Sequence, residues 1–185
     1  MTVLTGLFYP LLIFGAGQII FSGRAQGSLL YLNQKVVGSE LIGQNFSEEK
    51  YFWPRPSVSD YQPLGSGGSN LSLTDKNLVA KILERKNWLL HSDRSLKEAQ
   101  IPSDLLYASG SGLDPHISPA AARIQVERIR LARKLDAGQA NMIFKLIDKI
   151  TEDRVLKIIG TPRVNVLKLN IALDGLNFKE IKQGK

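Results

Sequence analysis

The sequence predicts a mixed α/β (α+β) soluble domain attached to a single N-terminal transmembrane helix. The first observation is that residues 1–23 contain no acidic or basic side chain, so every charged side chain lies in residues 24–185. The second is that residues 24–185 alternate short strand-like and helix-like stretches, with no internal repeat and no heptad pattern. We therefore expect an anchor over residues 1–23 and one soluble domain over residues 24–185.

The apolar start, VLTGLFYPLLIFGAGQIIF, spans residues 3–21. As a helix it would extend roughly 28 Å, close to the hydrocarbon thickness of a bilayer. Pro10 would kink or end a helix in water, but transmembrane helices tolerate proline. Gly6, Gly15 and Gly17 offer small surfaces for close helix packing, so we expect them and Pro10 to lie at a subunit interface. A signal peptide or a buried core helix is the alternative, although the basic start of a signal peptide is missing.

The next stretches predict a hairpin and then a long loop. Residues 29–31 and 36–37, on either side of Asn33–Gln34, are typical of a β-hairpin. Residues 53–70, WPRPSVSDYQPLGSGGSN, are dense in Pro, Gly and Ser and predict irregular structure. Loops of this length in compact domains tend to be functional or disordered. Three aromatic residues at the entrance (51–53) favour a loop that is anchored to the domain.

Three helices and two strands follow. N-cap residues predict helices over 75–90, with Thr74 as the cap, and over 119–135, with Ser118 as the cap. Another helix is expected over 139–150. Short strands are expected over 105–108 and over 164–173, where VNVLKLNIAL places alternate apolar residues on one face. The polar tail after Leu173 is expected to be frayed.

Composition excludes several function classes. The chain has 185 residues, 24 Lys and Arg against 17 Asp and Glu, a net charge of +7, and no cysteine. Without cysteine it has no disulfide, zinc–thiolate site, iron–sulfur cluster or thiol nucleophile. His91 and His116 are too isolated to predict a metal site. The basic residues are scattered, which favours a solvated surface, or one that faces anionic lipid headgroups, over a nucleic-acid site.

The stretch SGSGLDPHIS (109–118) contains Ser111, Asp114 and His116 and so permits a membrane-anchored serine-type hydrolase. The members of such a triad usually come from distant parts of a chain, and the strand–nucleophile–helix context is missing. A Gly/Pro-shaped turn, in which Asp114 and Ser118 hydrogen-bond backbone amides, is the favoured interpretation. A third interpretation is that backbone N–H groups ahead of the helix bind a phosphate.

Gln125 and Arg128 are the unusual residues of the predicted helix over 119–135. Most polar side chains of this helix gather on one face, whereas these two fall within its apolar sector. Burying an amide or a guanidinium without a partner is costly, so each must meet a polar group, a ligand or another chain. A hydrogen bond within the core and a functional contact both remain open.

Six stretches of the chain are long and unusual: TGLFYPLL (5–12), VGSELIGQNF (37–46), YFWPRPS (51–57), SGGSNL (66–71), SGSGLDPHISPAAARIQ (109–125) and TPRVNVLKLNIAL (161–173). Taken in order, they resemble the C subunit of the bacterial Kdp potassium-transporting P-type ATPase. The resemblance covers most of the chain and implies one membrane helix with a soluble α/β domain, single-pass in the bacterial inner membrane. It implies no catalytic activity of the chain on its own.

The resemblance also implies partners and a role. The partners would be a channel-like K⁺-conducting subunit, a P-type ATPase subunit and membrane lipid, with no nucleic acid. The role would be to assemble a high-affinity K⁺ import complex and to act as a catalytic chaperone that raises the affinity of the pump subunit for ATP. No cofactor would be bound tightly, and ATP would be held through a site shared with the pump subunit. The implied nucleotide contacts are Ser109, Gly110, Ser111, Gly112 and Gln125, and Arg55 and Arg128 join the candidates for subunit contacts.

Two features stay open in this resemblance. A domain on the outer face, over the K⁺ entrance, would assemble or gate the complex without contacting cytoplasmic ATP. Members of the family usually have more residues, including basic ones, before the apolar segment. We therefore expect that residues 1–23 represent a truncated anchor.

Overall fold

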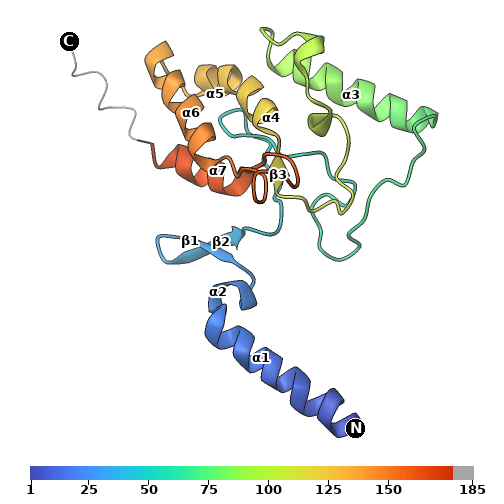
Figure 1. Cartoon of the computed structure of the whole chain (residues 1–185). Helices are drawn as coiled ribbons and strands as arrows, with labels where there is room; N and C mark the ends of the chain where they lie inside the picture. Colours follow the sequence, from blue (N-terminus) through green and yellow to red (C-terminus); the bar gives the residue numbers. More distant parts are fainter. Residues whose placement is uncertain (177–185) are drawn as a thin grey trace. The chain divides into compact units, whose positions relative to one another are not determined.

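The computed structural model describes residues 1–176 (Figure 1). It divides into two compact units, residues 1–41 and the part of the chain from Ile42 onward. The predicted mixture of helices and strands is confirmed, since helices dominate and the strands of the described residues form two two-stranded sheets. The predicted frayed tail lies largely in residues 177–185, outside the described part of the chain.

The first unit begins with two helical segments of different winding. A π-helix, η1 (Leu4–Phe8), leads directly into α1 (Tyr9–Ile20). Pro10 accounts for the change, because it has no N–H and its ring would collide with the carbonyl of an ordinary preceding α-turn. The wider π-turn lets the Tyr9 N–H donate to the Leu4 carbonyl. Among residues 1–176, no helix has both the length and the apolar character that a membrane crossing requires, so the predicted transmembrane helix is not confirmed.

The predicted hairpin is confirmed in the first unit. A short helix, α2 (Ser22–Ala25), precedes β1 (Leu29–Leu32), which pairs antiparallel with β2 (Lys35–Ser39). The two turn residues are left-handed, with φ of 50° at Asn33 and 63° at Gln34. Such a pair matches the twist of the flanking strands and so sets the register of the hairpin.

The second unit contains the remaining elements: α3 (Lys76–Ser92), η2 (Glu98–Gln100), η3 (Ser103–Leu105), β3 (His116–Ile117), α4 (Pro119–Ile124), α5 (Val126–Ala132), α6 (Ala137–Ile150), β4 (Val164–Asn165) and α7 (Val166–Asp174). β3 and β4 pair antiparallel, with His116 opposite Asn165. The predicted helix over 139–150 is confirmed as α6, whose N-cap Asp136 accepts from the Gln139 N–H at 2.8 Å. The loop over 53–70 has no regular structure, as predicted.

The core of the second unit forms around α6, against which α4, α5 and α7 pack. Its fully buried aliphatic side chains include Ile129, Ile143, Ile147, Val164, Leu169 and Leu173. Phe52 and Trp53, at the entrance of the long loop, belong to the same cluster although they lie in no helix or strand. The loop therefore starts from a buried, fixed point rather than from the surface.

The predicted strand over 164–173 is wrong beyond its first two residues. The chain turns at Asn165, whose side chain accepts from the Lys168 N–H at 3.0 Å and caps the helix α7. Val166, Leu169 and Leu173 are buried at helical spacing. Since apolar residues occur in this stretch at both period 2 and helical spacing, the alternation alone did not decide between a strand and a helix.

Three other local predictions need correction. The expected strand over 105–108 is absent, because η3 occupies Ser103–Leu105 and residues 106–108 are irregular. The N-cap of α3 is Asp75, which accepts from the Asn77 N–H at 2.7 Å, and not Thr74. The helix expected over 119–135 is divided at Gln125 into α4 and α5. The Gln125 side chain donates to the Ala121 carbonyl at 3.0 Å, which takes the place of the usual backbone bond.

Candidate functional site

The loop over 53–70 and the turn over 109–118 interlock in the second unit. The Ser109 N–H donates to the Pro56 carbonyl at 3.0 Å, and the Gly67 N–H donates to the Ser111 carbonyl at 2.9 Å. The Ser57 hydroxyl donates to the Gly112 carbonyl at 2.7 Å. Backbone groups of the Gly/Ser stretch are thus bonded to the loop, and the prediction that the loop is anchored is confirmed.

Gly112 fits this interlock only because it has no side chain. Its φ of +70° lies in the left-handed region, and a Cβ placed there would lie 2.5 Å from the Ser59 Oγ and 3.0 Å from the Gly67 carbonyl oxygen. Gly110 differs, because a Cβ at that position meets no other group within 4 Å. Within the predicted nucleotide-binding stretch, Ser109 is buried, whereas Gly110 and Ser111 are exposed.

Two side-chain amides, which we call the amide clamp, hold the entrance of the loop. The Gln125 Oε1 accepts from the Trp53 N–H at 2.7 Å, and its Nε2 donates back to the Trp53 carbonyl at 3.2 Å. Asn170 bonds the backbone of Phe52 in the same way: its Oδ1 accepts from the Phe52 N–H at 2.8 Å, and its Nδ2 donates to the Phe52 carbonyl at 3.0 Å. Two consecutive backbone units are therefore paired as they would be in a sheet, although the partners are side chains.

Arg128 completes the group around Trp53. Its Nη2 donates to the Gln125 Oε1 at 2.7 Å and to the Tyr51 carbonyl at 3.0 Å, and its Nη1 donates to the Glu49 carbonyl. The guanidinium carbon lies 3.4 Å from the centroid of the Trp53 ring, a cation–π contact. Burial lowers the pKa of Arg128 to about 9, which still leaves the group protonated at neutral pH. The expectation that Gln125 and Arg128 must meet polar partners is confirmed, and those partners belong to this chain.

Arg55 of the loop forms a charged cluster with Asp114 and His116 of the turn. The Arg55 Nη1 lies 2.9 Å from the Asp114 Oδ2, and the His116 Nδ1 lies 3.2 Å from the Asp114 Oδ1. Burial alone would raise the pKa of Asp114, but hydrogen bonds from His116 and Arg55 outweigh it and lower that pKa. Among residues 1–176, Arg55 Nε is buried without a hydrogen-bond partner.

A pocket of about 500 Å³ opens beside this cluster, and Asp104 and Arg163 line it together with Arg55, Asp114 and His116. Two guanidinium groups and two carboxylates line the same space, so its charge selects neither an anion nor a cation. Within the described chain, no three His, Asp or Glu side chains gather in a way that could hold a metal ion.

The side chains of a hydrolase triad are not assembled. The Ser111 Oγ accepts from the Leu113 N–H at 3.1 Å, and among the described residues no hydrogen bond joins it to His116. Asp114 also bonds the His116 N–H at 3.0 Å. Ser118 caps α4 by accepting from the Ala121 N–H at 3.0 Å. The turn interpretation of residues 109–118 is therefore the one that the geometry matches.

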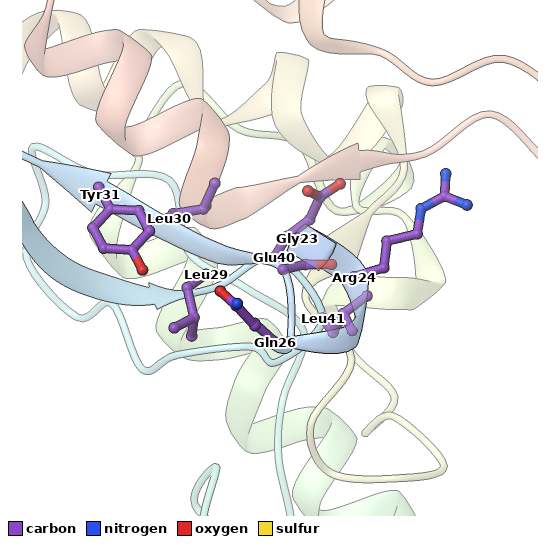
Figure 2. Close-up of a pocket in the computed structure, with 9 residues that line it drawn as sticks. Gly23, Arg24, Gln26, Leu29, Leu30, Tyr31, Glu40 and Leu41 are labelled. Carbon is purple, nitrogen blue, oxygen red and sulfur yellow. The ribbon is translucent and has the colours of Figure 1, made fainter. Parts of the chain in front are cut away.

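No other part of the described first unit packs against its candidate interface residues. A Cβ placed at Gly6, Gly15 or Gly17 meets nothing within 4 Å, and α1, which carries Pro10 in its first turn, buries no residue. A pocket of about 610 Å³, shown in Figure 2, lies between α2 and the hairpin. Arg24 and Glu40 bring opposite charges to its lining, which otherwise includes Leu29, Leu30 and Tyr31.

Sequence reasoning missed Asn170 and the pairing of Arg55 with Asp114. The signal for Asn170 was available, because it is the one amide within the apolar run VLKLNIAL. Arg55 was singled out, but the partner of its guanidinium lies 59 positions away in the chain and only the fold reveals it.

The fold and site together define a class of protein: an apolar N-terminal helical segment joined to a small α+β unit whose conspicuous polar residues hold its own loops. The comparisons then identify the family. The family model of KdpC, the c chain of the K⁺-transporting ATPase, matches residues 1–175, and the chain belongs to this family. The resemblance noted from the sequence is confirmed, and so is its assignment to an ATPase subunit rather than to a catalytic family.

Curated relatives agree with the family model over most of the chain. The chain is 51% identical over 179 residues to the potassium-transporting ATPase KdpC subunit of Serratia proteamaculans (strain 568), covering 95% of this chain and 93% of that protein. It is 47% identical over 178 residues to the protein of the same name from Polynucleobacter asymbioticus, covering 95% and 92%. For that of Leptospira interrogans the identity is 45% over 174 residues, covering 94% and 87%.

Proposed function

We propose that the chain is a non-catalytic accessory subunit of an ATP-driven, high-affinity K⁺ import complex in the bacterial inner membrane. The observation that carries this proposal is membership of the KdpC family over residues 1–175. The partners would be a channel-like K⁺-conducting subunit and a P-type ATPase subunit. The chain would contribute contacts and no chemistry, and its differential contact with the states of the complex would bias their equilibrium.

Residues 1–23 would be the membrane anchor. Helical backbone runs from residue 2 to residue 20, through η1 and α1, which corresponds to about 28 Å. This stretch carries no charged side chain, and Leu12, Phe14 and Ile19 are among its many exposed apolar side chains. Such a surface is stable when lipid or another apolar helix covers it. The free faces at Gly15 and Gly17 support contact with a partner helix there.

The predicted effect on ATP affinity has two possible routes. In the direct route, Ser109–Gly112 and Gln125 contact a nucleotide that the pump subunit also binds. In the indirect route, the chain only stabilises a pump conformation that binds ATP more tightly. The contacts of Gln125 favour the indirect route, because both atoms of its amide already bond to Trp53, Ala121 and Arg128. They equally favour the second candidate function, an assembly or gating subunit on the outer face with no nucleotide contact.

Co-purification tests the proposal. The full chain carrying an affinity tag is co-expressed with the two partner subunits, and complexes are recovered from detergent-solubilised membranes. We expect both partners in stoichiometric yield. A matched control lacks residues 1–23 and should lose most of the recovery, because the anchor contacts are gone. Recovery of the tagged chain from the membrane without either partner would contradict the proposal.

A further inference from the structure

Residues 152–163, between α6 and β4, form a segment that we call the finger, in which residues 153–161 are all exposed; the chain can be followed there between α6 and α7 in Figure 1. Its base is closed by Glu152 and Arg163, which exchange backbone hydrogen bonds of 2.8 and 3.0 Å and an ion pair of 3.0 Å. A second rung joins Val155 and Ile159, with backbone bonds of 2.9 and 3.0 Å. The finger is therefore a short hairpin held by two pairs of backbone hydrogen bonds, and not an irregular loop.

The tip of the finger exposes aliphatic side chains. The exposed fractions are 59% for Val155, 81% for Leu156, 79% for Ile158 and 64% for Ile159. The core resumes immediately after the finger, since Val164 is fully buried. Four large aliphatic side chains within five residues thus remain outside the core in the described structure, and an exposed cluster of this kind marks a contact surface.

The turn at the tip contains residues that are unusual for its backbone conformation. Leu156 and Lys157 both have left-handed backbones, with φ of 52° and 63°, and the Lys157 N–H donates to the Arg154 carbonyl at 2.9 Å. Asn and Gly are the residues that adopt this pair of conformations easily, whereas a leucine adopts it at a local cost. Outlying backbone conformations of this kind cluster at binding and functional sites. The tip accordingly presents a bulky apolar side chain at a position where turn formation alone favours a small or polar one.

The tip is also basic. Arg154 and Lys157 each precede a pair of aliphatic residues, and neither forms an ion pair among residues 1–176. Asp153, at the base, is the one acidic side chain between Glu152 and Gly160. Aliphatic side chains interleaved with free cations match the boundary between acyl chains and anionic headgroups.

We propose that the tip of the finger, residues 154–160, inserts into the anionic interface of the bilayer that holds the N-terminal segment. This inference rests on the proposed function, which supplies the membrane anchor. The unit that carries the finger begins at Ile42, shortly after the apolar segment ends at residue 21. Tethering of this kind raises the effective concentration of the tip at the bilayer, so insertion of a few side chains suffices for binding.

The small size of the finger favours lipid over a protein partner. A stable protein interface usually comprises roughly 20–30 residues on each side, with anchors seated in pockets. The tip offers seven residues, 154–160, and its large apolar side chains are all aliphatic. Aliphatic side chains need no complementary pocket in a bilayer, because acyl chains adapt to them.

The absence of cysteine allows a direct test on the full chain. Single cysteines are introduced as Leu156→Cys in the finger, Phe14→Cys in the anchor and Leu64→Cys in the long loop, where the leucine is 94% exposed. Each is labelled with an environment-sensitive fluorophore, and the protein is reconstituted into vesicles of phosphatidylcholine and phosphatidylglycerol. We expect nitroxides on the acyl chains to quench the labels at 14 and 156 and to leave the label at 64 unaffected.

The outcomes separate the two proposals. Quenching at 14 without quenching at 156 overturns the finger proposal and leaves the anchor in place, whereas no quenching at 14 overturns the anchor and with it the finger. A label at 156 that becomes shielded from aqueous iodide only when partner subunits are added, without acyl-chain quenching, identifies a protein contact and also overturns the proposal.

Two further variants extend the test. Ile158→Cys repeats the measurement at a second tip position in case Leu156→Cys disturbs the turn. Replacing Arg154 and Lys157 together by Gln should reduce the quenching at 158 in vesicles with phosphatidylglycerol, and should change it little in pure phosphatidylcholine. Equal quenching of this variant and the parent in both vesicles would contradict the role assigned to the two cations.

Discussion

Gln125 and Asn170 bind consecutive residues of the same loop from two different helical regions. Each amide accepts from the backbone N–H of its loop residue and donates to the carbonyl of the same residue, and both side chains are almost completely buried. A buried backbone group without a partner is costly, so these amides stabilise the backbone where Phe52 and Trp53 enter the core. The amide clamp is thus a structural device, whatever else Gln125 contacts in a complex.

This view predicts the effect of Gln125→Ala on stability. The substitution leaves the Trp53 N–H and carbonyl without partners and removes an acceptor from Arg128, so we expect the free energy of unfolding to fall by about 2–5 kcal/mol. Urea denaturation of the full chain in detergent measures it. Gln62→Ala is the matched control, because Gln62 is exposed, and it should change stability by less than about 0.5 kcal/mol.

The same variant separates the two routes to ATP affinity. If Gln125→Ala is as stable as Gln62→Ala, assembles normally and raises the apparent KM of the complex for ATP, then Gln125 contacts the nucleotide directly and the clamp is unimportant. A loss of stability with an unchanged KM in the complexes that still assemble supports the clamp.

Asp114 predicts a specific dependence of stability on pH. Its carboxylate is paired with Arg55 and bonded by His116, and these bonds outweigh burial and lower its pKa from the ordinary value of 3.8. A lowered pKa in the folded state means that the stabilisation is complete above about pH 3.8 and is lost as the pH falls through the folded pKa. We expect Asp114→Asn to be less stable than the parent at pH 6 and to approach it below pH 3.8. A difference that stays constant across this range would contradict the pairing.

At the scale of elements, the interlock between the loop over 53–70 and the turn over 109–118 supplies a matched pair of variants. Gly112→Ala combines a left-handed φ of +70° with a Cβ that lies 2.5 Å from the Ser59 Oγ, so it should destabilise the chain by about 1–3 kcal/mol. Gly110→Ala meets nothing within 4 Å and should change stability by less than about 0.5 kcal/mol. Thermal unfolding of the two variants measures the difference, and equal melting temperatures would show that the interlock is absent.

The anchor predicts an effect on assembly. Replacing Gly15 and Gly17 by Leu fills the small faces of α1, which nothing within the described first unit covers, and should lower co-purification of the partner subunits at least several-fold. Ile13→Leu keeps the side-chain volume on the same helix and is the control. Recovery that is equal for both variants would place the partner contact elsewhere on the segment.

Short-range patterns predicted the elements whose signals are local. The hairpin was predicted from two strand-like runs around Asn33–Gln34, and α6 was predicted over 139–150 without its cap, Asp136. The prediction of a strand from Val164 to Leu173 failed because the apolar residues there fit both the period of a strand and that of a helix. The cap at Asn165 decides in favour of a helix. The division of the helix at Gln125 depends on a side chain that bonds the loop 72 positions earlier, which no local pattern contains.

The candidate site shows the same limit. Gln125 and Arg128 were recognisable from the sequence as polar residues on an apolar face, because the argument needs only helical spacing. Their partners were not recognisable, since Trp53, Tyr51 and Glu49 belong to a segment without periodicity. The nucleotide contacts that the family resemblance implies remain a prediction, as do the subunit contacts at Arg55, at Arg128 and in the apolar N-terminal segment.

At the scale of the whole molecule, the net charge of +7 belongs entirely to residues beyond 23. The apolar segment, the finger and the clamped loop differ in their chemistry. The first suits acyl chains and a partner helix, the second suits an anionic interface, and the third is held in place by the chain itself. A subunit that stabilises an assembly needs surfaces of this kind and needs no catalytic group of its own.

The most direct measurement of the central claim is K⁺-stimulated ATP hydrolysis by the two partner subunits, purified from cells with and without this chain. A non-catalytic accessory subunit predicts that the chain alone hydrolyses no ATP, and that the partners regain K⁺-stimulated hydrolysis only when the chain is present. Full K⁺-stimulated hydrolysis by the partners without the chain, or ATP hydrolysis by the isolated chain, would contradict the account.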